Sequence, residues 1–100
     1  MDPRFFHEVI VCYDVRANRS RQKLFEALKD LGLVPVQRSV MWGMLNRAEK
    51  GAVLRLFREH LDTDTDRAFL LEGDLREAVG KYGFGHSQEE LVPPGDAYSV

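Results

Sequence analysis

The sequence has one cysteine, no long hydrophobic run and no strong excess of charge of either sign, and each shortage excludes a class of protein. Cys12 is the single cysteine among 100 residues, so we expect no internal disulfide and no cysteine-based zinc site. The longest stretch without a charged residue is residues 39–46, whereas a membrane span needs about 20 apolar residues. No apolar signal-peptide core follows Met1. The sequence therefore predicts a protein of the reducing cytoplasm with no membrane segment.

The composition is that of an ordinary globular protein, with 44% hydrophobic and 30% charged residues. A chain of 100 residues has the usual length of one domain. The net charge of −2 is divided unevenly: residues 1–60 hold eleven Lys and Arg against seven Asp and Glu, and residues 61–100 hold three against nine. Such asymmetry favours a polyanion-binding face, although a solvated helix start explains the basic cluster at 16–23 equally well.

The first 32 residues predict a strand followed by a helix. The near-continuous apolar run in Glu8–Val15 is typical of a strand buried on both faces. Asn18 or Ser20 is a suitable N-cap for a helix that runs to Leu31, and its leucines recur at helical spacing. Gly32 is placed to end that helix as the residue after its C-cap.

Residues 33–61 predict two short strands and a second helix. In the segment 33–45, Pro35 belongs on an edge strand or at a bulge, and Gly43 indicates a bulge or a close backbone approach. Asn46 and Glu49 have the spacing of a capping box at the start of a helix. We expect the apolar face of that helix to consist of Val53, Leu54, Leu56, Phe57 and Leu61.

A polar turn at 63–66 and a strand at 67–73 complete the predicted core, and glycines and prolines interrupt the rest of the chain. The order strand-helix-strand-strand-helix-strand predicts an α+β, ferredoxin-like βαββαβ sandwich. We assign residues 1–78 to this core and residues 79–100 to a Gly/Pro-rich C-terminal tail. Ala97–Val100 is a candidate for an extra C-terminal strand.

Asp14 is the first candidate for chemistry because it ends the first strand and precedes the basic cluster. A carboxylate beside a phosphate-attracting surface suits Mg²⁺ bound against a phosphodiester. The alternative is an aspartate that only caps a turn. One carboxylate is few for Mg²⁺, and no spacing in the chain supplies a second ligand. A two-fold axis near Asp14 would bring a second copy of it, so this hypothesis requires a homodimer.

Other residues that could carry chemistry favour structural interpretations. His7, His60 and His86 share no ligand spacing, and Cys12 is best explained as a small buried residue of the first strand. Residues 81–86 resemble part of an RNA-binding motif, but they follow the last core strand and lack further aromatic residues, which favours a glycine-rich connector. Trp42 could stack on a base, although core or interface packing is the commoner use of such a residue.

Two sequence features together resemble a known family. The first strand ends in Tyr13-Asp14, and the run Val36–Gly43 reads Val-Gln-x-Ser-Val-x-x-Gly; with Arg19–Leu24 and Gly32-Leu33 between them, they resemble the small CRISPR-associated adaptation protein. This is the lesser of the two proteins of spacer acquisition, and it is often described as an endoribonuclease. The resemblance extends over residues 8–74.

The resemblance implies a ferredoxin-like homodimer with Mg²⁺ held at the dimer axis by Asp14 of each chain. It also implies a scaffold that bridges the CRISPR integrase and holds duplex DNA, with Mg²⁺-dependent cleavage of single-stranded RNA or duplex DNA as the activity described in the family. Asp14 is therefore the catalytic and metal candidate. The candidates for nucleic-acid binding are Tyr13, Arg16, Arg19, Arg21, Lys23 and Arg38. An exchanged C-terminal strand would support the dimer.

Two departures from the family favour the scaffold over efficient catalysis. Pro35 stands where members often have arginine, and Met41 stands where they often have phenylalanine. Two other classes stay open: a toxin-type ribonuclease of the virulence-associated group, which has the same fold and a similar aspartate, and a regulatory domain that binds a small molecule.

Overall fold

Eight secondary-structure elements build the part of the chain that the computed structural model describes, residues 3–85. A short 3-10 helix at Pro3–Phe5 precedes the first strand. In chain order the others are β1 (His7–Asp14), α1 (Asn18–Asp30), β2 (Val34–Gln37), β3 (Val40–Leu45), α2 (Arg47–His60), β4 (Arg67–Glu72) and α3 (Leu75–Tyr82). No helix within 3–85 is long and apolar enough to cross a membrane.

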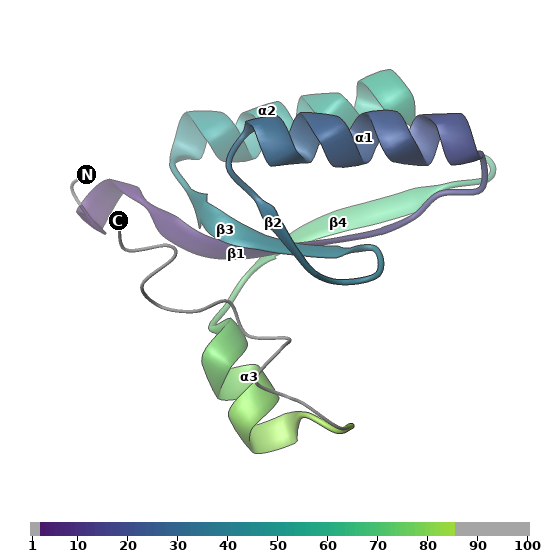
Figure 1. The fold of residues 1–100 in the computed structure, drawn as a ribbon. Helices are drawn as coiled ribbons and strands as arrows, with labels where there is room; N and C mark the ends of the chain where they lie inside the picture. The colour runs from purple at the N-terminus through teal and green to yellow at the C-terminus, as the bar shows by residue number, and fades with distance from the viewer. Residues whose placement is uncertain (1–2, 86–100) are drawn as a thin grey trace.

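The strands form one antiparallel sheet in the order β2-β3-β1-β4. Helices α1 and α2 lie side by side on one face of the sheet, and α3 lies on the other side (Figure 1). This arrangement confirms the predicted α+β, ferredoxin-like βαββαβ fold. The predicted extra strand at 97–100 lies outside the described residues, and α3 crosses the predicted domain boundary at 78.

The core lies between the sheet and the two helices. Alternate residues of β1 are buried, and Val9 and Val11 are fully inaccessible to solvent. They pack with Leu24 and Leu28 of α1 and with Val53 of α2. The opposite face of β1 is only half-buried at Ile10, Cys12 and Glu8. The prediction that β1 is buried on both faces was therefore wrong, because helices cover only one face of the sheet.

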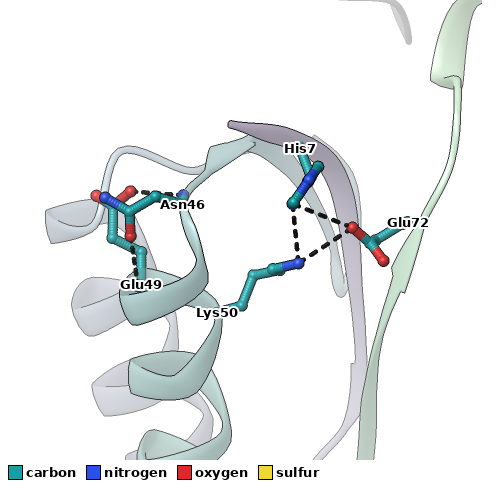
Figure 2. Close-up of polar contacts among 5 residues, drawn as sticks. All are labelled: His7, Asn46, Glu49, Lys50 and Glu72. Carbon is teal, nitrogen blue, oxygen red and sulfur yellow. Dashed lines mark hydrogen bonds and ion pairs between the residues drawn. The ribbon is translucent and has the colours of Figure 1, made fainter. Parts of the chain in front are cut away.

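Local sequence signals fix most element ends. Gly32 has a φ of +99°, a left-handed conformation that glycine adopts without steric cost, and its N–H donates to Lys29 O at 2.9 Å. Asn46 and Glu49 form the predicted capping box at the start of α2 (Figure 2). The N-cap of α1 is Ala17, not Asn18 or Ser20. Asn18 instead accepts a hydrogen bond from the guanidinium of Arg21, so its side chain serves the first turn from inside the helix.

Four further features refine the sequence interpretation. Pro35 lies on the edge strand β2, as predicted, next to a register irregularity. Gly43 allows a close approach of Leu33, since a Cβ at position 43 would lie 2.5 Å from Leu33 Cδ2. Leu54 is 47% exposed and does not belong to the buried face of α2. Helix α3 was not predicted, because Gly80 and Gly83 indicated a connector; Asp74 caps its first turn.

A polar cluster joins α2 to the sheet at the end where β1 begins (Figure 2). Lys50 Nζ lies 3.1 Å from Glu72 Oε1 and 2.9 Å from His7 Nδ1, and His7 Nδ1 lies 3.3 Å from the same Glu72 oxygen. His7 thus takes part in a contact between α2 and the sheet. The cluster fixes the end of the sheet that lies opposite Asp14.

Candidate functional site

The candidate site lies where β1 ends, between the start of β4 and the β2–β3 turn. Asp14 is exposed and is the last residue of β1. Its neighbour across the β1–β4 pair is Arg67, the first residue of β4. On the other side, the backbone N–H of Tyr13 donates to Ser39 O at 3.1 Å, which holds the β2–β3 turn against the end of β1. Three strands of the sheet therefore determine the position of Asp14.

The β2–β3 turn has a constrained backbone. Ser39 has a φ of +64°, in the left-handed region that residues other than glycine rarely adopt. Its neighbour Arg38 is exposed. The hydrogen bond to Tyr13 secures this turn, and the sheet thereby presents Arg38 at the same end as Asp14.

The loop from β1 to α1 is tied to the loop before β4. The backbone N–H of Arg16 donates to Asp66 Oδ1 at 2.9 Å, and the backbone N–H of Asp62 donates to Asp66 Oδ2 at 2.9 Å. These hydrogen bonds favour the ionised carboxylate and so lower the pKa of Asp66, and the bond from Arg16 has the largest effect. Asp66 is therefore a structural residue of the site, and the side chain of Arg16 remains exposed.

Arg21 has a mixed role. Its Nη1 donates to the carbonyl oxygen of Val15 at 2.8 Å, and its Nη2 donates to Asn18. These bonds brace the β1–α1 loop and leave part of the five-donor guanidinium for other contacts. Arg19 and Lys23 stand four residues apart on α1 and are both exposed, so they share one face of the helix.

Tyr13 differs from the other candidates because it is only 7% exposed and belongs to the core. Burial raises the pKa of its hydroxyl, and the nearby charge of Arg21 opposes this effect. Tyr13, Arg21, Arg38 and Phe25 line a shallow cavity of about 300 Å³ beside the β2–β3 turn. Any contact of Tyr13 with nucleic acid is confined to the part of its side chain that borders this cavity.

The structure brings one carboxylate to the predicted metal position. Within residues 3–85 no group of three His, Cys, Asp or Glu side chains could hold a metal ion. Asp14 makes no side-chain hydrogen bond within that range, and the residue is exposed. A hard oxygen ligand of this kind suits Mg²⁺, which is usually held by one or two carboxylates together with water and phosphate oxygens. A single protomer thus offers part of a site.

The face of the sheet that α1 and α2 do not cover is apolar around Asp14. Phe69 is 54% exposed and Leu71 is 39% exposed on β4, and both pair across to half-buried residues of β1, Cys12 and Ile10. Cys12 is less buried than predicted, and desolvation still raises the pKa of its thiol. We call this surface, formed by Ile10, Cys12, Trp42, Met44, Phe69 and Leu71, the open sheet face.

Arg67 was absent from the sequence candidates. Its place beside Asp14 follows only from the antiparallel pairing of β1 with β4. The signal was available, since both strands were predicted and the βαββαβ order places the last strand against the first. The start of an antiparallel neighbour lies beside the end of the first strand.

Comparison with known proteins places the site in context. A family model described as CRISPR associated protein Cas2 matches residues 7–77, which include β1 to β4. A protein named CRISPR-associated endoribonuclease Cas2 1, from Francisella tularensis subsp. novicida, is 34% identical over 82 residues, which are 82% of this chain and 84% of that relative. The crystal structure of a hypothetical protein from Thermus thermophilus is similar with a TM-score of 0.62 and 25% identity, over 69% of this chain and 83% of that one.

Proposed function

This chain belongs to the CRISPR-associated Cas2 protein family, and we propose that it acts in spacer acquisition as a homodimer that binds nucleic acid and holds Mg²⁺ at Asp14. In this role it bridges the CRISPR integrase around duplex DNA, and it retains an endonuclease site for single-stranded RNA or duplex DNA. The observation that carries the proposal is the position of Asp14, exposed at the end of the central strand β1 with arginines beside it.

The nucleic-acid contacts of this proposal are made to phosphates. Arg16, Arg19, Lys23 and Arg38 are exposed on the loop and helix that follow Asp14 in the chain and on the β2–β3 turn. They come from a loop, a helix and a turn, so their charges are spread over several elements. Such contacts position a backbone without selecting sequence. We expect binding that weakens steeply as salt rises, because each phosphate contact releases counterions.

The open sheet face supports a second copy of this chain as the dimer partner. A protomer alone leaves about half of Phe69 and more than a third of Leu71 exposed to water, and apolar patches of this kind favour association. Successive side chains of a strand point to opposite faces, and Asp14, Cys12 and Ile10 alternate with the core residues of β1. Asp14 therefore projects from the open sheet face. A two-fold axis through that face presents the same patch to itself and supplies a second Asp14 carboxylate.

In the proposed nuclease reaction, Asp14 of each protomer would hold Mg²⁺ through carboxylate oxygens. When bound, Mg²⁺ activates water and neutralises negative charge on a phosphodiester. The arginines orient the substrate by charge-assisted hydrogen bonds to phosphate oxygens. The proposal gives the Asp66 carboxylate a structural role, because each of its oxygens accepts a backbone N–H group.

The surroundings of the two family departures support the scaffold as the main role. Met41 is fully buried beneath the helices and has no access to substrate. Pro35 lies on the outer edge strand and brings no charge. Neither position adds a group that could contact a phosphate. The site retains a carboxylate and cations, which suffice for binding.

The decisive experiment compares wild type with Asp14→Ala on single-stranded RNA and on duplex DNA, each with Mg²⁺ or with EDTA. Asp64→Ala, in an exposed loop, is the matched control. Cleavage that requires both Mg²⁺ and Asp14 would establish the nuclease. Binding without cleavage by a folded dimer would leave the scaffold role alone. Equal cleavage by wild type and Asp14→Ala would contradict the site assignment.

The bridging role has its own test. Duplex binding is measured with and without the CRISPR integrase, and the proposal expects a ternary complex that contains two copies of this chain. The toxin-type alternative predicts growth arrest with RNA cleavage in a host that lacks any CRISPR system, and our proposal predicts normal growth.

A further inference from the structure

Arg67 and Asp14 form the last residue pair of the β1–β4 ladder. Residues directly opposite each other in an antiparallel pair project from the same face, with their Cβ atoms about 5 Å apart. Arg67 therefore lies on the open side of the sheet together with Asp14. Both residues are exposed in the protomer, so an external ligand can reach both there.

Arg67 is not committed to an internal partner. Among residues 3–85 its side chain forms no hydrogen bond or ion pair, and the same holds for Asp14. Asp66, the acidic neighbour in sequence, accepts the N–H groups of Arg16 and Asp62 instead. The structure therefore holds a guanidinium and a carboxylate side by side without pairing them.

The backbone around Arg67 is firmly positioned. The bond from Arg16 N to Asp66 Oδ1 joins the two chain segments that flank the pair, and the strand pairing with β1 begins at Arg67 itself. Preorganisation of this kind lowers the cost of ordering a side chain around a ligand. Arg19 and Lys23, by contrast, project from the surface of α1.

We propose that Arg67 is a phosphate-binding residue of the Asp14 site, whose guanidinium binds the non-bridging oxygens of the phosphodiester next to Asp14. The inference rests on the proposed function and deepens it, because it names the group that holds the substrate at the reacting position. A guanidinium suits this task, since its planar donors match a phosphate in a bidentate manner. Under this proposal Arg67 binds the phosphate and Asp14 binds the metal, so variants of Arg67 can test phosphate binding independently of metal binding.

The first test measures binding without metal. Oligonucleotide affinity is measured in EDTA over a range of salt concentrations for wild type, Arg67→Ala, Arg67→Lys and Arg47→Ala. Arg47 is the matched control because it is an exposed arginine at the opposite end of the sheet. We expect Arg67→Ala to weaken binding equally for all sequences and to reduce the slope of log K against log salt by about one. Arg67→Lys should keep the slope, and Arg47→Ala should not change it.

The second test measures cleavage with Mg²⁺. Arg67→Ala should lower kcat by on the order of 10²-fold, as loss of one charge-stabilising donor does in other enzymes, and Arg67→Lys should recover part of the rate. If wild type binds but is not a nuclease, the salt slope decides the inference.

The outcomes separate this inference from the proposed function. A wild type that binds no nucleic acid would overturn both. A wild type that binds, together with a folded Arg67→Ala whose salt slope equals that of Arg47→Ala, would overturn the role of Arg67 alone. Lower thermal stability of Arg67→Ala with an unchanged slope would show a purely structural cross-strand residue and would also overturn it.

Discussion

Trp42 Nε1 donates a hydrogen bond of 2.7 Å to Glu8 Oε2, and the same oxygen accepts the backbone N–H of Leu75 at 2.7 Å. One carboxylate thus joins β1, β3 and the start of α3. Leu75 is only 8% exposed. Its hydrogen bond to Glu8 and the burial of its side chain hold the start of α3 against the sheet. Glu8 fixes the position of a helix that local sequence signals did not predict.

We expect Glu8→Ala to lower the free energy of unfolding by about 2 kcal/mol, because two donors lose a charged acceptor. Trp42 is the single tryptophan, so its fluorescence should change with the loss of the bond. Urea unfolding, followed by this fluorescence and by circular dichroism, measures both effects. Glu59→Ala, at an exposed position of α2, is the control and should change stability by less than about 0.5 kcal/mol. Equal stability of the two variants would show that the Glu8 contacts contribute nothing.

Gly43 should not tolerate a side chain. A Cβ at this position would lie 2.5 Å from Leu33 Cδ2 and 3.4 Å from Leu33 Cα, and Leu33 is 1% exposed. We expect Gly43→Ala to cost about 1–3 kcal/mol through overpacking. A double-mutant cycle with Leu33→Val checks the cause, because the smaller side chain should reduce the cost of Gly43→Ala. Strictly additive effects would place the cost elsewhere.

Asp66 should make stability depend on pH at acidic values. Its pKa is lowered by the hydrogen bonds from Arg16 and Asp62, so the folded state favours the ionised form. This contribution is fully present above the unfolded pKa of about 3.9 and is lost as pH falls through the lower folded value. The stability difference between wild type and Asp66→Asn should therefore shrink as pH falls below about 4. Asp64→Asn in the same loop is the control, and a difference between wild type and Asp66→Asn that is constant with pH would contradict the assignment.

The open sheet face should control oligomeric state. Phe69→Asp places a charge on that face, and Leu54→Asp places the same charge on an exposed leucine of α2. We expect Phe69→Asp to be a folded monomer and Leu54→Asp to keep the dimer of the wild type, as measured by sedimentation over a range of concentrations. Both substitutions leave the core intact, since Phe69 is already 54% exposed and Leu54 is 47% exposed. A dimeric Phe69→Asp would exclude this face as the interface.

The sequence predicted those features that local chemistry determines. Gly32 ends α1 and the Asn46–Glu49 capping box begins α2 because each depends on a few neighbouring residues. The prediction that Asn18 caps α1 was wrong. Its side chain instead accepts a hydrogen bond from Arg21, which lies one turn later in the helix. The apolar side chains of Ile10 and Cys12 predicted burial, but pattern alone does not tell whether a helix of the same chain provides it.

The position of Asp14 could be predicted from the sequence, because it depends only on where one strand ends. Arg67 was missed because its position beside Asp14 depends on the register between β1 and β4, and the two residues are 53 positions apart in sequence. Tyr13 was predicted as a contact residue, yet the pleat of β1 directs it toward the helices.

The two edges of the sheet differ in their capacity to accept another strand. Edge strand β2 has only four residues, contains Pro35 and has an irregular register, and each of these features hinders the addition of a strand. Edge strand β4 is regular over six residues and contains no proline. Within residues 3–85, β4 is therefore the edge at which a strand from another chain would be added. Addition at one edge alone would favour a closed pair over an open-ended fibre.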